Sequence, residues 1–96
     1  MLDLLLQLIG LLAVGVLISL TIEVICITIQ TIKEELLKRK SELNGVIKAF
    51  VKQKQIINGR HVVTLDMLDK LGNSKGSVKM EGQTCSVNKG QAISLY

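Results

Sequence analysis

The chain has no proline and no tryptophan, and few of its side chains are aromatic, thiol or imidazole groups. It contains one phenylalanine, one tyrosine, two cysteines and one histidine. Proteins that bind single-stranded nucleic acid usually stack bases on aromatic side chains, so this scarcity argues against nucleic acid as a partner. A single histidine excludes a histidine-pair metal site. Cys26 and Cys85 do not have the spacing of a zinc or redox motif.

Recognisable catalytic and phosphate-binding motifs are also missing. The eight glycines form neither the G-x-G-x-x-G pattern nor a P-loop. Asp66 and Asp69 are three residues apart and could act as paired acids, but Asp66 begins a predicted short helix, where capping is the ordinary role of aspartate. His61 lies in a predicted strand without a catalytic motif around it. The sequence therefore predicts no catalytic residue, no metal and no cofactor, and a protein that is not an enzyme.

Basic residues are absent from the first 32 positions, where Asp3 and Glu23 are the only charged side chains. An uncharged apolar run extends from residue 4 to residue 22, and about 20 such residues cross a bilayer. We therefore predict that residues 1–32 contain a single transmembrane helix, from residue 4 to about residue 29. A secretory signal peptide would begin with basic residues, and so would a type IV pilin leader.

A cluster of basic residues directly follows this predicted span. The cluster comprises Lys33, Lys38, Arg39 and Lys40. The positive-inside rule then places the C-terminus in the cytoplasm and the N-terminus outside. Polybasic segments beside a membrane are attracted to anionic headgroups, so we predict that these four residues contact anionic lipid. A cytoplasmic domain would also keep Cys85 reduced.

The small and polar residues in the second half of the predicted span share one helical face. They are Gly15, Ser19, Glu23, Cys26 and Gln30. Small residues let helix backbones approach, and polar side chains can then bond across the contact. This stripe predicts a homo-oligomer assembled through the span. The alternative is that Glu23 lies at the membrane surface and only marks the end of the helix.

The remainder of the chain divides into two predicted segments. Residues 33–52 read as a basic juxtamembrane helix, because their apolar residues recur at spacings of three, four and seven. Residues 53–96 read as a small cytoplasmic β domain, with Asn58-Gly59 as a type I′ hairpin turn. A short helix is expected at 66–73, and short strands at 77–81, 85–87 and 92–96. The predicted core comprises Ile56, Val62 or Val63, Leu65, Leu68, Leu71, Val78, Met80, Val87, Ile93 and Leu95.

The expected fold is membrane α plus small β: a transmembrane helix, a basic helix and a C-terminal meander or miniature barrel. A β domain of about 40 residues is marginally stable alone, so we expect a protein partner or self-association to support it. The sequence favours a non-catalytic, single-pass membrane protein that self-associates through its span and presents the β module as a structural or adaptor component. The alternative is a holin-like or virion-associated protein that permeabilises membranes.

Overall fold

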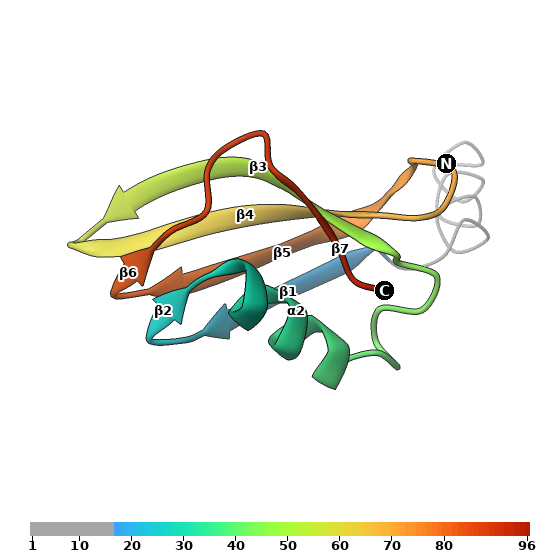
Figure 1. Cartoon of the computed structure of the whole chain (residues 1–96), viewed down its shortest axis with the longest axis horizontal. Helices are drawn as coiled ribbons and strands as arrows, with labels where there is room; N and C mark the ends of the chain where they lie inside the picture. The colour runs from blue at the N-terminus through green and yellow to red at the C-terminus, as the bar shows by residue number, and fades with distance from the viewer. Residues whose placement is uncertain (1–16) are drawn as a thin grey trace, which may run out of the picture.

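A computed structural model describes residues 17–96, which form a domain built mainly from β-strands (Figure 1). In chain order the elements are β1 (Ile18–Glu23), β2 (Cys26–Ile27), α2 (Ile29–Lys38), β3 (Lys48–Ile57), β4 (Arg60–Leu68), β5 (Ser74–Gly82), β6 (Thr84–Cys85) and β7 (Ala92–Ser94). Five strands form one sheet in the order β1-β5-β4-β3-β7, while β2 and β6 form a separate parallel pair. The arrangement is a β3–β4–β5 meander extended by β1 on one side and β7 on the other.

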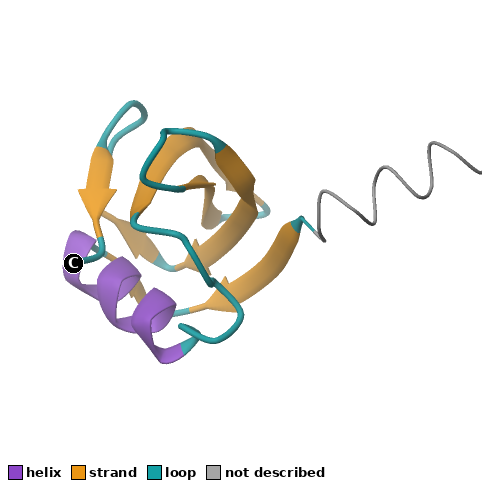
Figure 2. Ribbon diagram, turned by 90° about the vertical axis from the view of Figure 1, so that its right-hand side faces the viewer, coloured by secondary structure: helices purple, strands orange, loops and turns teal. Residues whose placement is uncertain are grey.

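The large sheet curls around an apolar core, and α2 lies against its open side (Figure 2). The helix contributes Ile32 and Leu36, which are almost fully buried. The core residues are Ile22, Ile27, Ile32, Leu36, Leu43, Val46, Ala49, Val51, Val63, Leu65, Met67, Val78, Met80, Val87, Ile93 and Leu95. Since this core draws on β1 and α2 as well as the meander, the N-terminal and C-terminal parts of residues 17–96 fold as one unit.

Strand β1 occupies a region where the sequence predicts a membrane helix. Its residues alternate in character: Ile18, Leu20 and Ile22 face the core side, and the residues between them are polar and exposed. Alternation with a period of two is the pattern of a half-buried strand, and isoleucine and threonine also favour strands. Pairing is parallel, with Ile18 opposite Gly76 and Ile22 opposite Met80. The segment therefore buries its apolar residues against protein.

The predicted transmembrane architecture is wrong for the residues that the structure describes. From residue 17 to residue 96, no helix has both the length and the apolarity that crossing a bilayer requires. The helix α2 has ten residues and is amphipathic. The membrane α plus small β fold is thus replaced by a β domain with one short helix, and the single-pass location with an outside N-terminus and a cytoplasmic C-terminus is a wrong prediction. Residues 4–16 of the predicted span lie outside the described residues.

The predicted basic helix of residues 33–52 is shorter in the structure and begins earlier. Thr28 caps α2, because its side-chain oxygen accepts a hydrogen bond of 3.0 Å from the Thr31 backbone N–H. The helix ends at Lys38, and a turn follows in which Gly45 has a φ of +85°. Beyond that turn Ala49 and Val51 are buried on alternate positions of β3. Within residues 33–52 the spacing of the buried residues therefore changes from that of a helix to that of a strand.

The hairpin predicted at Asn58-Gly59 is confirmed. Asn58 and Gly59 have φ values of 53° and 78°, as a type I′ turn requires, and they join β3 to β4 with Ile57 opposite Arg60. The helix predicted at 66–73 is wrong. β4 continues to Leu68, and a tight turn leads into β5.

Most of the predicted core is buried. Val62, Val63, Leu65, Val78, Met80, Val87, Ile93 and Leu95 are all buried. Ile56 and Leu71, however, are 68% and 77% exposed. Both lie near hairpin turns at the ends of the sheet, beyond the part that the rest of the chain covers. Their exposure leaves an apolar side chain at the surface of each end of the sheet.

Candidate functional site

The stripe predicted to hold helices together is dispersed in the structure. Ser19 and Glu23 are exposed on β1, Cys26 is exposed on β2, and Gln30 is exposed on α2. Gly15 lies outside the described residues. These side chains do not share a helical face, so the helical argument for self-association does not apply to residues 17–30. Glu23 is simply an outward-facing residue at the end of a strand.

The basic cluster lies on α2 and the turn that follows it, and most of it is engaged within the chain. Lys33, Lys38, Arg39 and Lys40 are its members. Arg39 donates to the Glu35 carboxylate at 2.9 Å, and Lys38 lies 3.4 Å from the same carboxylate. The hydrogen bond from Arg39 and the nearby Lys38 lower the pKa of Glu35. Lys40 stacks over the Tyr96 ring, 5.3 Å from its centroid, which leaves Lys33 as the least engaged of the four.

Side chains that could bind a metal ion do not cluster in the described domain. Within residues 17–96 there is no cluster of three or more histidine, cysteine, aspartate or glutamate side chains suited to a metal ion. Cys26 lies opposite Thr84 and Cys85 lies opposite Ile27 in the parallel β2–β6 pair, so the two free thiols face opposite sides of it. Asp66 accepts a hydrogen bond from the Ser74 hydroxyl and caps no helix.

The most distinctive surface is an open strand edge. β7 pairs with β3 only from Lys48 to Phe50. Two further bonds of 2.8 Å close the ladder at Val51: its N–H donates to the Gln91 carbonyl, and its carbonyl accepts from the Gly90 N–H. From Gln53 to Ile57, β3 is paired with β4 on one side, Lys52 is the extra residue at a shift in the register, and no other part of residues 17–96 forms a ladder with Lys52 to Ile57 on the other side. We call residues 52–57 the open edge.

Both faces of the open edge are uncovered. All of its side chains are exposed, whereas Ala49 and Val51 earlier in the same strand are buried. An irregularity in the register lies between Val51 and Gln53, opposite Leu65 and Thr64; an extra residue at such a bulge bends the strand and increases its twist. The ladder then resumes regularly as far as the turn. The open edge is therefore a formed strand, but the rest of the described domain does not pack on its side chains.

The two faces of the open edge carry different side chains. Lys54 lies opposite Val63, and Ile56 lies opposite His61. Residues directly opposite each other in an antiparallel pair share a face, so Lys54 and Ile56 extend the core side of the sheet beyond the core itself. The alternate residues Gln53, Gln55 and Ile57 lie on the other face.

The charge of the open edge is uncompensated. The two ion pairs within residues 17–96 both involve Glu35 on α2. Lys52 and Lys54 therefore have no acidic partner in the described domain, and Arg60 adds a third cation just after the turn. Two exposed apolar side chains, Ile56 and Ile57, lie among them, 68% and 48% exposed. The surface is both basic and apolar, and it presents unpaired backbone groups.

Comparisons with known proteins add no relative: no protein-family model, curated protein or solved structure matches this chain.

The sequence contains a signal for the open edge, which is the absence of apolar residues from part of a strand. The stretch "KQKQ" at 52–55 lies within a strand but has no apolar residue at either alternate position. A strand with one buried face shows apolar residues at every second position, so a β-rich hairpin arm without them is exposed on both faces. The missing apolar alternation indicates an edge that the domain itself does not cover.

Proposed function

We propose that this domain is a non-catalytic binding module that captures an extended, acidic segment of a partner protein along the open edge of β3. The single observation that carries this proposal is the ladder that ends at Val51 while β3 continues to Ile57. In strand addition, main-chain hydrogen bonds supply affinity, and contacts with alternate side chains supply specificity. An adaptor or structural role follows from such a capture.

The length of the open edge suits a short peptide strand. The six residues from Lys52 to Ile57 span roughly 20 Å at about 3.3 Å per residue. In an antiparallel pair alternate residues direct both backbone groups to the same side, so roughly three residues of the edge offer an N–H and a carbonyl outward. A bound strand would satisfy these groups and cover Ile56 or Ile57 according to its side-chain alternation.

Charge selects the partner. Lysines on an exposed edge discourage pairing with other copies of the same protein, because Lys52 and Lys54 of two copies would meet. An acidic strand would instead place carboxylates near both ammonium groups. Opposite charges across adjacent strands contribute roughly 0.2–1 kcal/mol per pair. The same residues thus reject a second copy and favour an acidic strand with apolar residues between its acids.

The test uses a synthetic peptide, acetyl-Glu-Val-Glu-Val-Glu-Val-amide, titrated into the full chain while amide resonances are followed by NMR. We expect saturable shifts in residues 52–57, and slower hydrogen exchange of the outward amides there. Lys52→Glu combined with Lys54→Glu should weaken binding on the order of tenfold at low salt. The same variant should gain affinity for the peptide in which lysine replaces each glutamate.

The matched control is Lys70→Glu combined with Lys75→Glu, which changes net charge equally at the other end of the domain. It should leave acidic-peptide binding nearly unchanged. If this control weakens binding as much as the edge variant, overall charge and not the open edge is responsible, and the proposal fails. A peptide N-methylated on alternate residues must also lose binding, since it cannot form the ladder; equal affinity would refute strand addition.

A further inference from the structure

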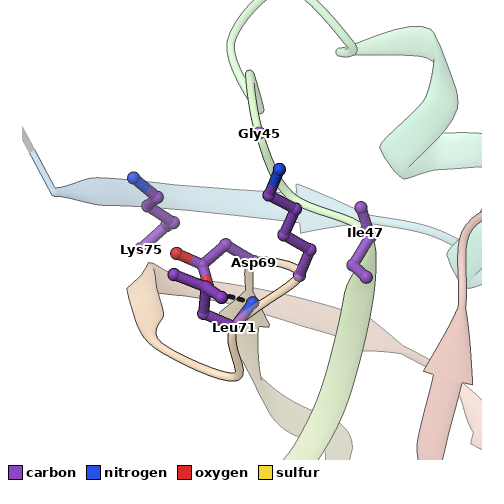
Figure 3. A pocket seen from close by; sticks show the side chains of 6 residues that line it. Gly45, Ile47, Asp69, Leu71 and Lys75 are labelled. Carbon is purple, nitrogen blue, oxygen red and sulfur yellow. Dashed lines mark hydrogen bonds between the residues drawn. The ribbon is translucent and has the colours of Figure 1, made fainter.

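A hollow lies at the end of β3 opposite the open edge, where the strand begins (Figure 3). It has a volume of about 380 Å³ and is lined by Gly45, Ile47, Asp69, Lys70, Leu71 and Lys75. These residues come from the turn before β3, from the β4–β5 hairpin turn and, in the case of Lys75, from the start of β5. Figure 1 places that hairpin turn and the β3–β4 turn at opposite ends of the domain. The hollow is therefore separate from the open edge.

The wall of the hollow is mostly apolar. Ile47 projects from one side and Leu71 from the other (Figure 3), and they are 38% and 77% exposed. The Asp69 carboxylate holds the position of Leu71, because it accepts 2.9 Å hydrogen bonds from the N–H groups of Leu71 and Asn73. Gly72 follows with a φ of +83°, a conformation that glycine adopts without strain. The turn keeps an apolar side chain at the surface instead of folding it into the core.

Two cations flank this apolar wall. Lys70 and Lys75 both line the hollow, and neither takes part in an ion pair within residues 17–96. Asp69 is the only acid in the lining, and one of its oxygens already accepts two backbone hydrogen bonds. The hollow thus combines an apolar surface with a net positive rim.

We propose that this hollow binds a single-chain amphiphile with an anionic head, namely a free long-chain carboxylate. The hydrocarbon chain lies on Ile47 and Leu71, and the carboxylate lies between the ammonium groups of Lys70 and Lys75. A peptide fits less well, because its main-chain N–H and carbonyl groups need partners and the mostly apolar wall offers few. A hydrocarbon chain brings no such requirement. The volume lies within the range of about 300–1,000 Å³ that is usual for small-molecule sites.

The experiment is a titration of the full chain with decanoate below its aggregation concentration, followed by methyl NMR. We expect saturable shifts of the Ile47 and Leu71 methyl groups. Lys70→Glu combined with Lys75→Glu should weaken binding on the order of tenfold. Leu71→Ser should also weaken it, and because Leu71 is exposed this variant keeps the fold. Lys52→Glu combined with Lys54→Glu is the matched control and should bind decanoate as the unaltered chain does.

Several results would overturn this inference. Equal binding of decanol would show that the lysines do not select a charged head, and equal binding of acetate would show that the apolar wall is not used. Tighter binding of a short peptide ending in a leucine carboxylate would replace the amphiphile with a peptide terminus. Since the two lysine pairs lie at opposite ends, failure here leaves the open-edge proposal standing, and the converse also holds.

Discussion

Replacing Gly76 with alanine probes the parallel pairing of β1 with β5. Gly76 lies opposite Ile18, and its φ is +126°. An added Cβ would collide with the Ile18 backbone N and O and would lie 2.8 Å from its Cα. Residues other than glycine in such a backbone region cost about 1–3 kcal/mol, and overpacking costs roughly another 1–3 kcal/mol. The expected loss is therefore roughly 2–6 kcal/mol.

That loss is a large share of the stability of a domain of this size, which has roughly 4–12 kcal/mol. The assay is urea unfolding of the full chain, with hydrogen exchange of β1 amides as a local readout. We expect a lower midpoint and faster exchange in β1, because the clash is with its backbone and flexible side chains cannot relieve it.

Gly72→Ala is the matched control within the same hairpin. Gly72 also has a positive φ, +83°, but an added Cβ there would meet nothing within 4 Å. It should cost only about 1–2 kcal/mol, from the left-handed conformation alone. If Gly76→Ala proves no more destabilising than Gly72→Ala, β1 does not pair closely with β5 at this position, and the parallel register described above is refuted.

Three further substitutions test individual contacts. Glu23→Gln should raise the free energy of unfolding by a few tenths of a kcal/mol at low salt, since Glu23 lies opposite Glu81; a loss above about 1 kcal/mol would mean that its charge is needed. Arg39 lowers the pKa of Glu35, so this stabilisation is present above the ordinary carboxyl range and is lost as pH falls through the lowered pKa. Glu35→Gln should remove that pH dependence, about 0.3–0.5 kcal/mol, from unfolding curves measured between acid and neutral pH, and an unchanged dependence would contradict the ion pair. His61 Nδ1 is buried without a hydrogen-bond partner, so His61→Leu should be neutral or stabilising by up to about 1 kcal/mol in thermal or urea unfolding, whereas clear destabilisation would indicate a contact that the imidazole makes.

The residues around Glu23 follow the pattern of a β-strand, although the mean hydropathy of the segment is typical of a membrane span. Mean apolarity over residues 4–22 matches a bilayer span, yet "ISLTIE" at 18–23 alternates between apolar and polar residues. Period two and a β-branched composition indicate a strand. Glu23 is costly inside a membrane helix but ordinary as an exposed residue on a strand. The period of the pattern was the more reliable guide to this segment than its average hydropathy.

The site was less accessible from the sequence than the fold. The Asn58-Gly59 turn locates the hairpin, and the alternation in β4 and β5 places their buried residues. The arm from Lys52 to Ile57 has no strand on its outer side because β7 ends before reaching it. The end of the β3–β7 ladder is fixed by the hydrogen bonds of Val51 with Gln91 and Gly90, which lie about forty residues away along the chain. No local sequence pattern predicts such a distant contact.

By itself, the sequence determined some local features: the hairpin at Asn58-Gly59 and the inward residues of the later strands. These depend on neighbouring residues, through φ preferences and periodicity. Only the tertiary structure decided that residues 18–23 add to β5 as a parallel strand, that β7 pairs with only the first residues of β3, and that Leu71 and Ile47 frame a hollow. An apolar segment can be buried equally well by lipid, by its own domain or by a partner, because the hydrophobic effect is not directional. The distant strands with which it pairs determine which of these occurs.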